Sequence, residues 1–150
     1  PNTSIMILTQ RDVEKVRESL MEIGIDKKDF LVKSVSPEEV PKYMKSADIA
    51  LSFIKPCYSK LSSSPTKIAE YLVSGLPIIS NSGVGDLDKL IKDENVGLIL
   101  RDFDKQSYDK VLNNIENLLG EEIAWHCQKT GYKLFDLEKV AGVKYRSLYK

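Results

Sequence analysis

The sequence has few residues of the kinds that bind metals or form disulfides: two cysteines and one histidine among 150 residues. Cys57 and Cys127 are too few and too far apart in the chain for a disulfide framework or a zinc site. We therefore expect no bound metal. Low cysteine content also favours a reduced, cytoplasmic setting.

Net charge and long apolar runs are lacking as well. The 22 basic and 22 acidic residues cancel, so no overall positive field attracts nucleic acid or an anionic membrane. The longest apolar run is far below the roughly 18 residues that span a bilayer, and no basic-then-apolar leader opens the chain. With 42% hydrophobic residues, the sequence predicts a soluble protein with one core, a single domain over residues 1–150 that binds no nucleic acid.

Apolar patterning predicts strands and helices in alternation over the first hundred residues. Strands are expected at 4–8, 30–35, 49–53, 77–80 and 98–100, the first of them buried on both faces, with helices at 13–23, 37–44, 66–74 and 86–92 between them. Parallel neighbours need crossovers of this length. The sequence therefore predicts an α/β fold with a doubly wound parallel sheet, followed from Asp104 by C-terminal helices only.

Ligands of an open parallel sheet bind beyond the carboxyl ends of its strands, which directs attention to the loop before the helix at 66–74. Hydroxyls and unpaired backbone N–H groups gather there at a helix N-terminus, an arrangement that favours phosphate. The alternative is that Ser64 only caps this helix, with Pro65 at its first position. The candidate phosphate-binding residues are Ser62, Ser63, Ser64, Pro65, Thr66 and Lys67.

Glu70 follows one turn later and is a candidate for accepting two hydroxyls of a ribose ring. The alternative is an exposed helix carboxylate paired with Lys67. Gly83, in Ser82-Gly83-Val84-Gly85-Asp86, could let the backbone approach an anion. An ordinary turn with Asp86 as N-cap explains that segment equally well.

Other catalytic patterns find little support. The segment around Gly83 is neither a Walker A loop nor the full dinucleotide fingerprint, which disfavours a P-loop NTPase or a dehydrogenase. No nucleophile is paired with a base, which disfavours a hydrolase. His126, beside Trp125 in the helical tail, is expected to be structural.

Taken together, residues 43–100 resemble the donor-binding core of the retaining group-1 glycosyltransferases of GT-B fold. The resemblance is carried by Ala47-Asp48-Ile49, by Pro65-Thr66-Lys67-Ile68-Ala69-Glu70-Tyr71-Leu72-Val73-Ser74-Gly75-Leu76-Pro77-Ile78-Ile79, by Gly83 and by Asn95-Val96-Gly97-Leu98-Ile99.

The resemblance implies specific roles. Glu70 matches the glutamate that binds the ribose hydroxyls, and Pro65 and Thr66 fall where backbone amides meet the diphosphate. Ser62 stands where the family often has another Glu facing the transferred sugar. The implied reaction is transfer of a sugar from a nucleotide-diphosphate donor to an acceptor hydroxyl with retention, in glycan or cell-surface polysaccharide synthesis. It needs neither metal nor cofactor.

Family C-terminal domains usually begin one strand earlier and follow an acceptor-binding N-terminal domain. We therefore expect this chain to be a fragment of a longer two-domain protein and to be inactive alone. Its expected partners are a nucleotide sugar and either that N-terminal domain or a separate acceptor subunit, and any peripheral membrane contact is expected through that missing half. The base, the sugar, the acceptor and the oligomeric state are left open.

Three alternatives remain. A nucleotide-sugar epimerase of the same fold would carry a similar ribose-binding glutamate. A binding-only half could serve a separate catalytic subunit. A receiver-type signalling domain is disfavoured, because Thr9-Gln10-Arg11 stands where an acidic pair is required.

Overall fold

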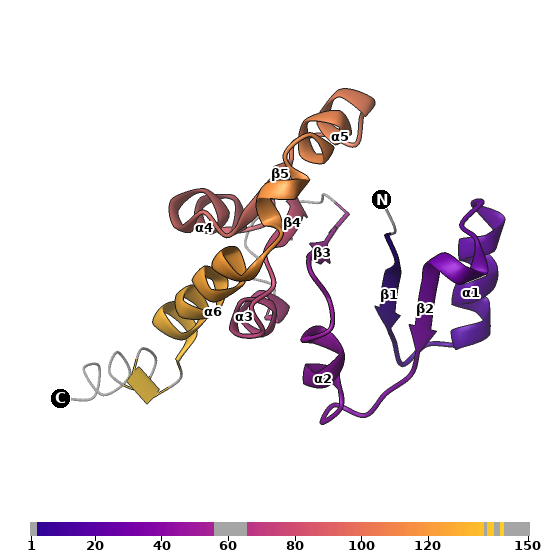
Figure 1. Ribbon diagram of the computed structural model, residues 1–150, viewed down its shortest axis with the longest axis horizontal. Helices are drawn as coiled ribbons and strands as arrows, with labels where there is room; N and C mark the ends of the chain where they lie inside the picture. The colour runs from indigo at the N-terminus through magenta and orange to yellow at the C-terminus, as the bar shows by residue number, and fades with distance from the viewer. Residues whose placement is uncertain (1–2, 56–65, 137, 140–141, 143–150) are drawn as a thin grey trace. The chain divides into compact units, whose positions relative to one another are not determined.

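The computed structural model describes residues 3–55, 66–136, 138–139 and 142. The chain divides into two compact units, Pro1–Ala47 (unit 1) and Asp48–Lys150 (unit 2), and Figure 1 draws their elements. Parallel strands form two sheets, flanked by helices. The α/β prediction is confirmed, while the single domain stays a prediction.

Unit 1 is a βα unit followed by a short helix. Strand β1 (Ile5–Leu8) pairs in parallel with β2 (Phe30–Lys33), with Ile5 opposite Phe30. Helix α1 (Val13–Glu22) and the 3₁₀ turn η1 (Lys27–Asp29) connect them. All four β1 residues are only half-buried, so the prediction of burial on both faces is wrong for this strand. Within the described residues, β2 is the one strand that pairs with β1.

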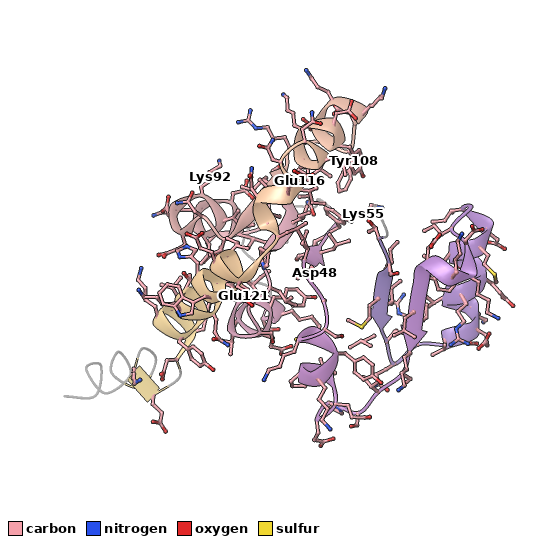
Figure 2. The ribbon with its side chains drawn as sticks, in the orientation of Figure 1. Asp48, Lys55, Lys92, Tyr108, Glu116 and Glu121 are labelled. Atoms are coloured by element: carbon pink, nitrogen blue, oxygen red, sulfur yellow. The ribbon has the colours of Figure 1, made fainter. Side chains whose placement is uncertain are left out.

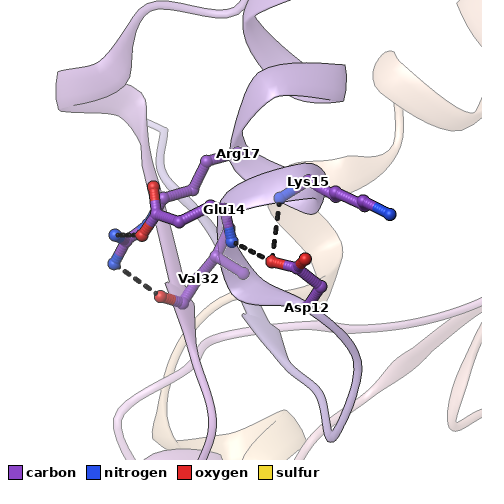
Figure 3. A network of polar contacts seen from close by, with 5 residues as sticks. All are labelled: Asp12, Glu14, Lys15, Arg17 and Val32. Carbon is purple, nitrogen blue, oxygen red and sulfur yellow. Dashed lines mark hydrogen bonds and ion pairs between the residues drawn. The ribbon is translucent and has the colours of Figure 1, made fainter.

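Hydrogen bonds hold α1 in place at its first turn (Figure 3). The Asp12 carboxylate accepts the backbone N–H groups of Glu14 and Lys15 at 3.1 and 3.3 Å, which satisfies two of the unpaired amides of the helix start. Arg17 bonds Glu14 at 2.6 Å and donates to the Val32 carbonyl oxygen at 3.0 Å. One guanidinium therefore joins α1 to β2.

Helix α2 (Val40–Met44) begins later than the sequence predicts. The expected capping contact is present, because the Glu39 carboxylate accepts the Ser36 backbone N–H at 3.1 Å. This bond is the main cause of the lowered pKa of Glu39. Pro41 explains the later start, since proline fits a helix only in its first turn.

Unit 2 contains the three-stranded parallel sheet in the order β3-β4-β5, and its strand bounds lie within two residues of prediction. Strand β3 (Ala50–Ser52) is shorter than expected, and β4 runs one residue further than expected. The other elements are β4 (Ile78–Asn81), β5 (Gly97–Leu100), α3 (Lys67–Val73), α4 (Leu87–Glu94), α5 (Lys105–Leu112), the 3₁₀ helix η3 (Ile115–Leu118) and α6 (Glu121–Phe135).

Both faces of this sheet are covered, as successive residues of β4 show. Ile78 belongs to one buried cluster, to which α3, α4 and α6 contribute, and the next residue, Ile79, belongs to another with α5 and η3 residues. Side chains alternate across a strand, so the two clusters lie on opposite faces. This is the doubly wound arrangement that the alternating pattern predicts. No helix in the described ranges is long and apolar enough to cross a membrane.

Candidate functional site

The candidate site lies where β3, β4 and β5 end, at Ser52, Asn81 and Leu100. Ligands of parallel sheets bind beyond such strand ends. Ser62, Ser63, Ser64 and Pro65, four of the predicted contacts, lie outside the described residues. Thr66, Lys67, Glu70 and Gly83 are described, and so is the chain leaving β3 as far as Lys55, which is labelled in Figure 2.

Residues 80–82 join the three strand ends through side chains. Ser80 Oγ donates to the Ser52 carbonyl oxygen at 3.0 Å, and Ser82 Oγ donates to the Arg101 carbonyl oxygen at 2.7 Å. Between them, Asn81 Oδ1 accepts the Ile54 backbone N–H at 2.7 Å. Asn81 and Ser82 therefore hold the chain just beyond β3 and β5, whereas the Ser80 bond lies within the paired strands β3 and β4. Sequence reasoning missed this role, for which the only signal was a run of polar residues ending an apolar strand.

Helix α3 brings three predicted contacts together. Thr66 immediately precedes the helix and makes no side-chain cap, Lys67 is its first residue, and Glu70 lies one turn on. Lys67 Nζ and Glu70 Oε2 are 4.0 Å apart, with side chains 65% and 54% exposed. A pair at this distance and exposure contributes little to stability. Within the described part of the chain, no hydrogen bond occupies the Glu70 carboxylate.

The negative charge of Glu70 affects the pKa of its neighbour Tyr71. Burial raises the pKa of the Tyr71 phenol above its usual value, and the negative charge of Glu70 raises it further. Tyr71 packs against the buried cluster that contains Ile68 and Leu72. The apolar face of α3 is therefore anchored in the core while Glu70 lies on its exposed side.

Gly83 lies in the loop between β4 and α4, apart from the α3 residues. Its φ of +80° is a conformation that favours glycine. Its N–H donates to Asp88 Oδ2 at 3.3 Å, and among the described hydrogen bonds none joins it to α3. Asp86 precedes α4 as expected, without a side-chain capping bond. An anion reaching the Gly83 amide would have to displace the Asp88 carboxylate.

Other titratable groups of unit 2 have structural roles. His126 Nε2 lies 2.6 Å from the Glu94 carbonyl oxygen, to which it donates, and this joins α6 to α4 as expected of a structural histidine. Buried Cys127 has a pKa raised to about 11 by burial. Among the residues that the structure describes, no three His, Cys, Asp or Glu side chains are grouped to hold a metal ion.

A hollow of about 490 Å³ lies along α1 in unit 1. Its lining is mainly apolar, and Arg11, Asp12 and Lys15 supply its charges. None of the predicted contacts lines it. We therefore assign it no part in the candidate site.

Comparison with known proteins places the fold but not the family. No family model matches the sequence, and no curated protein matches it. The structure is similar to the crystal structure of WaaG, a glycosyltransferase involved in lipopolysaccharide biosynthesis, with a TM-score of 0.63 and 18% sequence identity. The match covers 97% of this chain and 37% of the WaaG chain. At this identity the likeness shows the fold alone: parallel strands and flanking helices consistent with a Rossmann-like half of a glycosyltransferase fold.

Proposed function

We propose that this chain binds the nucleotide-sugar donor of a retaining glycosyltransferase of GT-B type. Two independent findings support the proposal. The fold is similar to that of a glycosyltransferase, and Glu70 lies one turn into α3, the helix that follows β3. The transferase reading is favoured over the epimerase because the fold likeness is to a transferase.

The exposed Glu70 carboxylate is the observation that carries the proposal. Its side chain is 54% exposed, and its Oε2 lies 4.0 Å from Lys67 Nζ, which makes only a weak ion pair. A carboxylate accepts hydrogen bonds only, and two neighbouring hydroxyls of a ribose ring are matching donors. Bonds to a charged acceptor are shorter and stronger than neutral ones. Glu70 therefore has the right chemistry and accessibility to hold a nucleotide by its ribose.

Charge distribution along the sequence favours the loop after β3 for the diphosphate. Lys55, Lys60 and Lys67 lie between Ile49 and Ala69, a stretch with no Asp or Glu. The loops after β4 and β5 instead carry Asp86, Asp102 and Asp104, and Asp88 follows in the first turn of α4. Because like charges repel a diphosphate, the stretch with lysines only is the better place for it.

The proposed chemistry is sugar transfer to an acceptor hydroxyl with retention. The chain would hold the donor in a fixed orientation, and its cations and amides would stabilise the charge that develops on the leaving diphosphate. Lys67 is the described cation beside Glu70. Neither a metal nor a cofactor is required in this scheme, and no general base is assigned to the chain.

The acceptor is proposed to bind elsewhere, because the chain spans 37% of the WaaG chain. A further domain or a separate subunit would supply the acceptor site and any membrane contact. The product would belong to glycan or cell-surface polysaccharide synthesis. A cytoplasmic setting is proposed, in keeping with the free, buried Cys127.

The test is nucleotide binding by the 150-residue chain, measured by ligand-observed NMR and calorimetry with UDP, GDP and ADP. We expect selective binding of one of them, weakened about 10- to 100-fold by Glu70→Ala, since two bonds to a charged acceptor are lost. Glu116→Ala is the matched control, because Glu116 is exposed in the same unit, on η3, and is labelled in Figure 2.

Nucleotides lacking the ribose hydroxyls identify what Glu70 binds. A 2′,3′-dideoxy nucleoside diphosphate should bind wild type and Glu70→Ala equally weakly, because each change removes the same two bonds. Additive losses would assign Glu70 another role. Absence of nucleotide binding by the folded wild-type chain would refute the proposed function.

A further inference from the structure

Asn81 is a polar side chain buried at the carboxyl end of β4, the central strand of the three-stranded sheet. It is 2% exposed and ends β4, whose residues Ile78 and Ile79 are apolar and buried. An amide in such a place is costly unless its hydrogen-bonding groups are paired. Both of its polar atoms are paired: Oδ1 accepts the Ile54 N–H at 2.7 Å, and Nδ2 donates to the Ser82 carbonyl oxygen at 3.1 Å.

These two partners belong to different loops of the candidate site. Ile54 is the second residue after β3, in the chain that leads towards α3 and Glu70. Ser82 is the first residue after β4 and precedes Gly83. One buried amide group therefore fixes the direction in which the chain leaves β3 relative to the loop after β4.

Neighbouring Ser80 is a buried polar side chain whose main partner lies within the strands. Ser80 is also fully buried, but its hydroxyl bonds the Ser52 carbonyl oxygen, inside the β3-β4 pair. Register between these strands is already set by backbone pairing from Ala50 to Ser52. Asn81 differs because its bond to the Ile54 N–H acts on a residue beyond Ser52, where the backbone pairing of β3 with β4 ends.

We propose that Asn81 is a positioning residue for nucleotide binding, which holds the start of the loop after β3 through the Ile54 amide. The inference rests on the proposed function. Asn81 touches no ligand in this account and acts through the backbone of Ile54 and Ser82. Replacing Asn81 with an apolar residue of similar size should preserve the fold and lower the affinity for the nucleotide.

The experiment uses the 150-residue chain with UDP, GDP and ADP as probes. Asn81→Leu removes both hydrogen bonds, Asn81→Asp keeps an oxygen acceptor for the Ile54 N–H, and Ser80→Ala is the control that removes a buried bond within the strands. Each variant is measured for nucleotide affinity, for thermal midpoint and for hydrogen exchange of the Ile54 amide. If Asn81→Leu does not fold, Asn81→Ser replaces it, because its hydroxyl ends one bond short of the Asn81 oxygen.

We expect Asn81→Leu to raise Ile54 exchange and to weaken nucleotide binding, each by about fivefold or more, the equivalent of one lost hydrogen bond. Asn81→Asp should recover part of the affinity. Ser80→Ala should bind nucleotide as tightly as wild type, even if its thermal midpoint is lower. Unchanged affinity in Asn81→Leu, with wild type binding normally, overturns the inference and leaves the proposed function standing. If affinity falls in proportion to the thermal midpoint in all variants, Ser80→Ala included, the inference is also overturned. Absence of binding by wild type refutes the proposed function itself, and the inference with it.

Discussion

Gly131 of α6 lies against the backbone of Val73 at the end of α3. A Cβ atom built at residue 131 would stand 2.7 Å from the Val73 nitrogen, closer than side-chain carbons approach backbone. Making room for this atom would require α3 or α6 to shift as a whole, because backbone lies on both sides of the contact. Because α3 carries Glu70, this close approach fixes the helix on which the proposed ribose contact depends.

Gly131→Ala should therefore destabilise the chain by about 1–3 kcal/mol, the usual cost of forcing an extra carbon into a packed interior. Helix propensity alone predicts the opposite, a gain of up to about 1 kcal/mol for replacing glycine in a helix. Denaturant unfolding shows whether the substitution lowers or raises the free energy of unfolding. Tyr132→Ala is the control, because Tyr132 is 56% exposed on the same helix and its loss should change the free energy little. A stabilised Gly131→Ala variant would show that α3 and α6 do not pack so closely.

Much of this fold follows from local pattern. Apolar runs predict all five described strands within two residues. Gly24 and Gly75 follow α1 and α3 with positive φ, a conformation that favours glycine. Patterns of this kind reflect backbone preferences and one buried face, which short segments already contain. They are less exact at the ends of elements, as in α2, which begins at Val40 because Pro41 fits a helix only in its first turn.

The site was less predictable than the fold. Their place at a helix N-terminus makes Glu70 and Thr66 candidates, but spacing alone favours an ordinary helix glutamate paired with Lys67, and only the resemblance to a family assigns the two residues their roles. Asn81 could not be found from sequence, since its bond to Ile54 depends on which strand lies beside β4. Spacing does not give strand order, so contacts between separate strands stayed hidden.

Cys127 gives a prediction on pH dependence. Burial raises its pKa from about 9 to about 11, so the folded chain retains the thiol proton more strongly than the unfolded chain. The resulting stability is fully present below about pH 9 and is lost as the pH rises through about 11. Two pKa units correspond to about 2.7 kcal/mol in all, of which about 2 kcal/mol is lost by pH 11.

Denaturant unfolding at pH 8 and pH 11 measures the loss, with Cys127→Ala as reference. Lysines and tyrosines titrate in both proteins, so the difference between the two pH slopes isolates the thiol. Equal slopes would mean that the Cys127 thiol ionises as easily in the folded chain as in the unfolded one.

Asp88 gives a test of the loop after β4. Its Oδ2 accepts the Gly83 N–H, while its Oδ1 is buried without a described partner. Because the loop after β3 is the proposed place of the diphosphate, Asp88→Asn should change nucleoside diphosphate affinity by less than about twofold, although it removes a negative charge beside Gly83. Calorimetry of both variants checks this, with Asp93→Asn, exposed on the same helix, as control. Binding that is about two- to fivefold tighter in Asp88→Asn alone would contradict this and place the diphosphate near Gly83, because a repelling charge is removed.

Lys67 should act on the diphosphate and not on the nucleoside. Its ammonium is 65% exposed and only weakly engaged by Glu70 at 4.0 Å, so it is free to pair with a phosphate. Lys67→Met should weaken binding of the preferred nucleoside diphosphate by up to about fivefold and leave binding of the matching nucleoside unchanged, because an exposed charge pair contributes at most about 1 kcal/mol. Salt should weaken wild-type binding more than that of the variant, since screening acts on the charge that the variant lacks.

Lys92→Met, exposed on α4 and labelled in Figure 2, is the matched control. Equal loss of nucleoside and diphosphate binding in Lys67→Met would mean that Lys67 supports α3 itself and does not meet the phosphates.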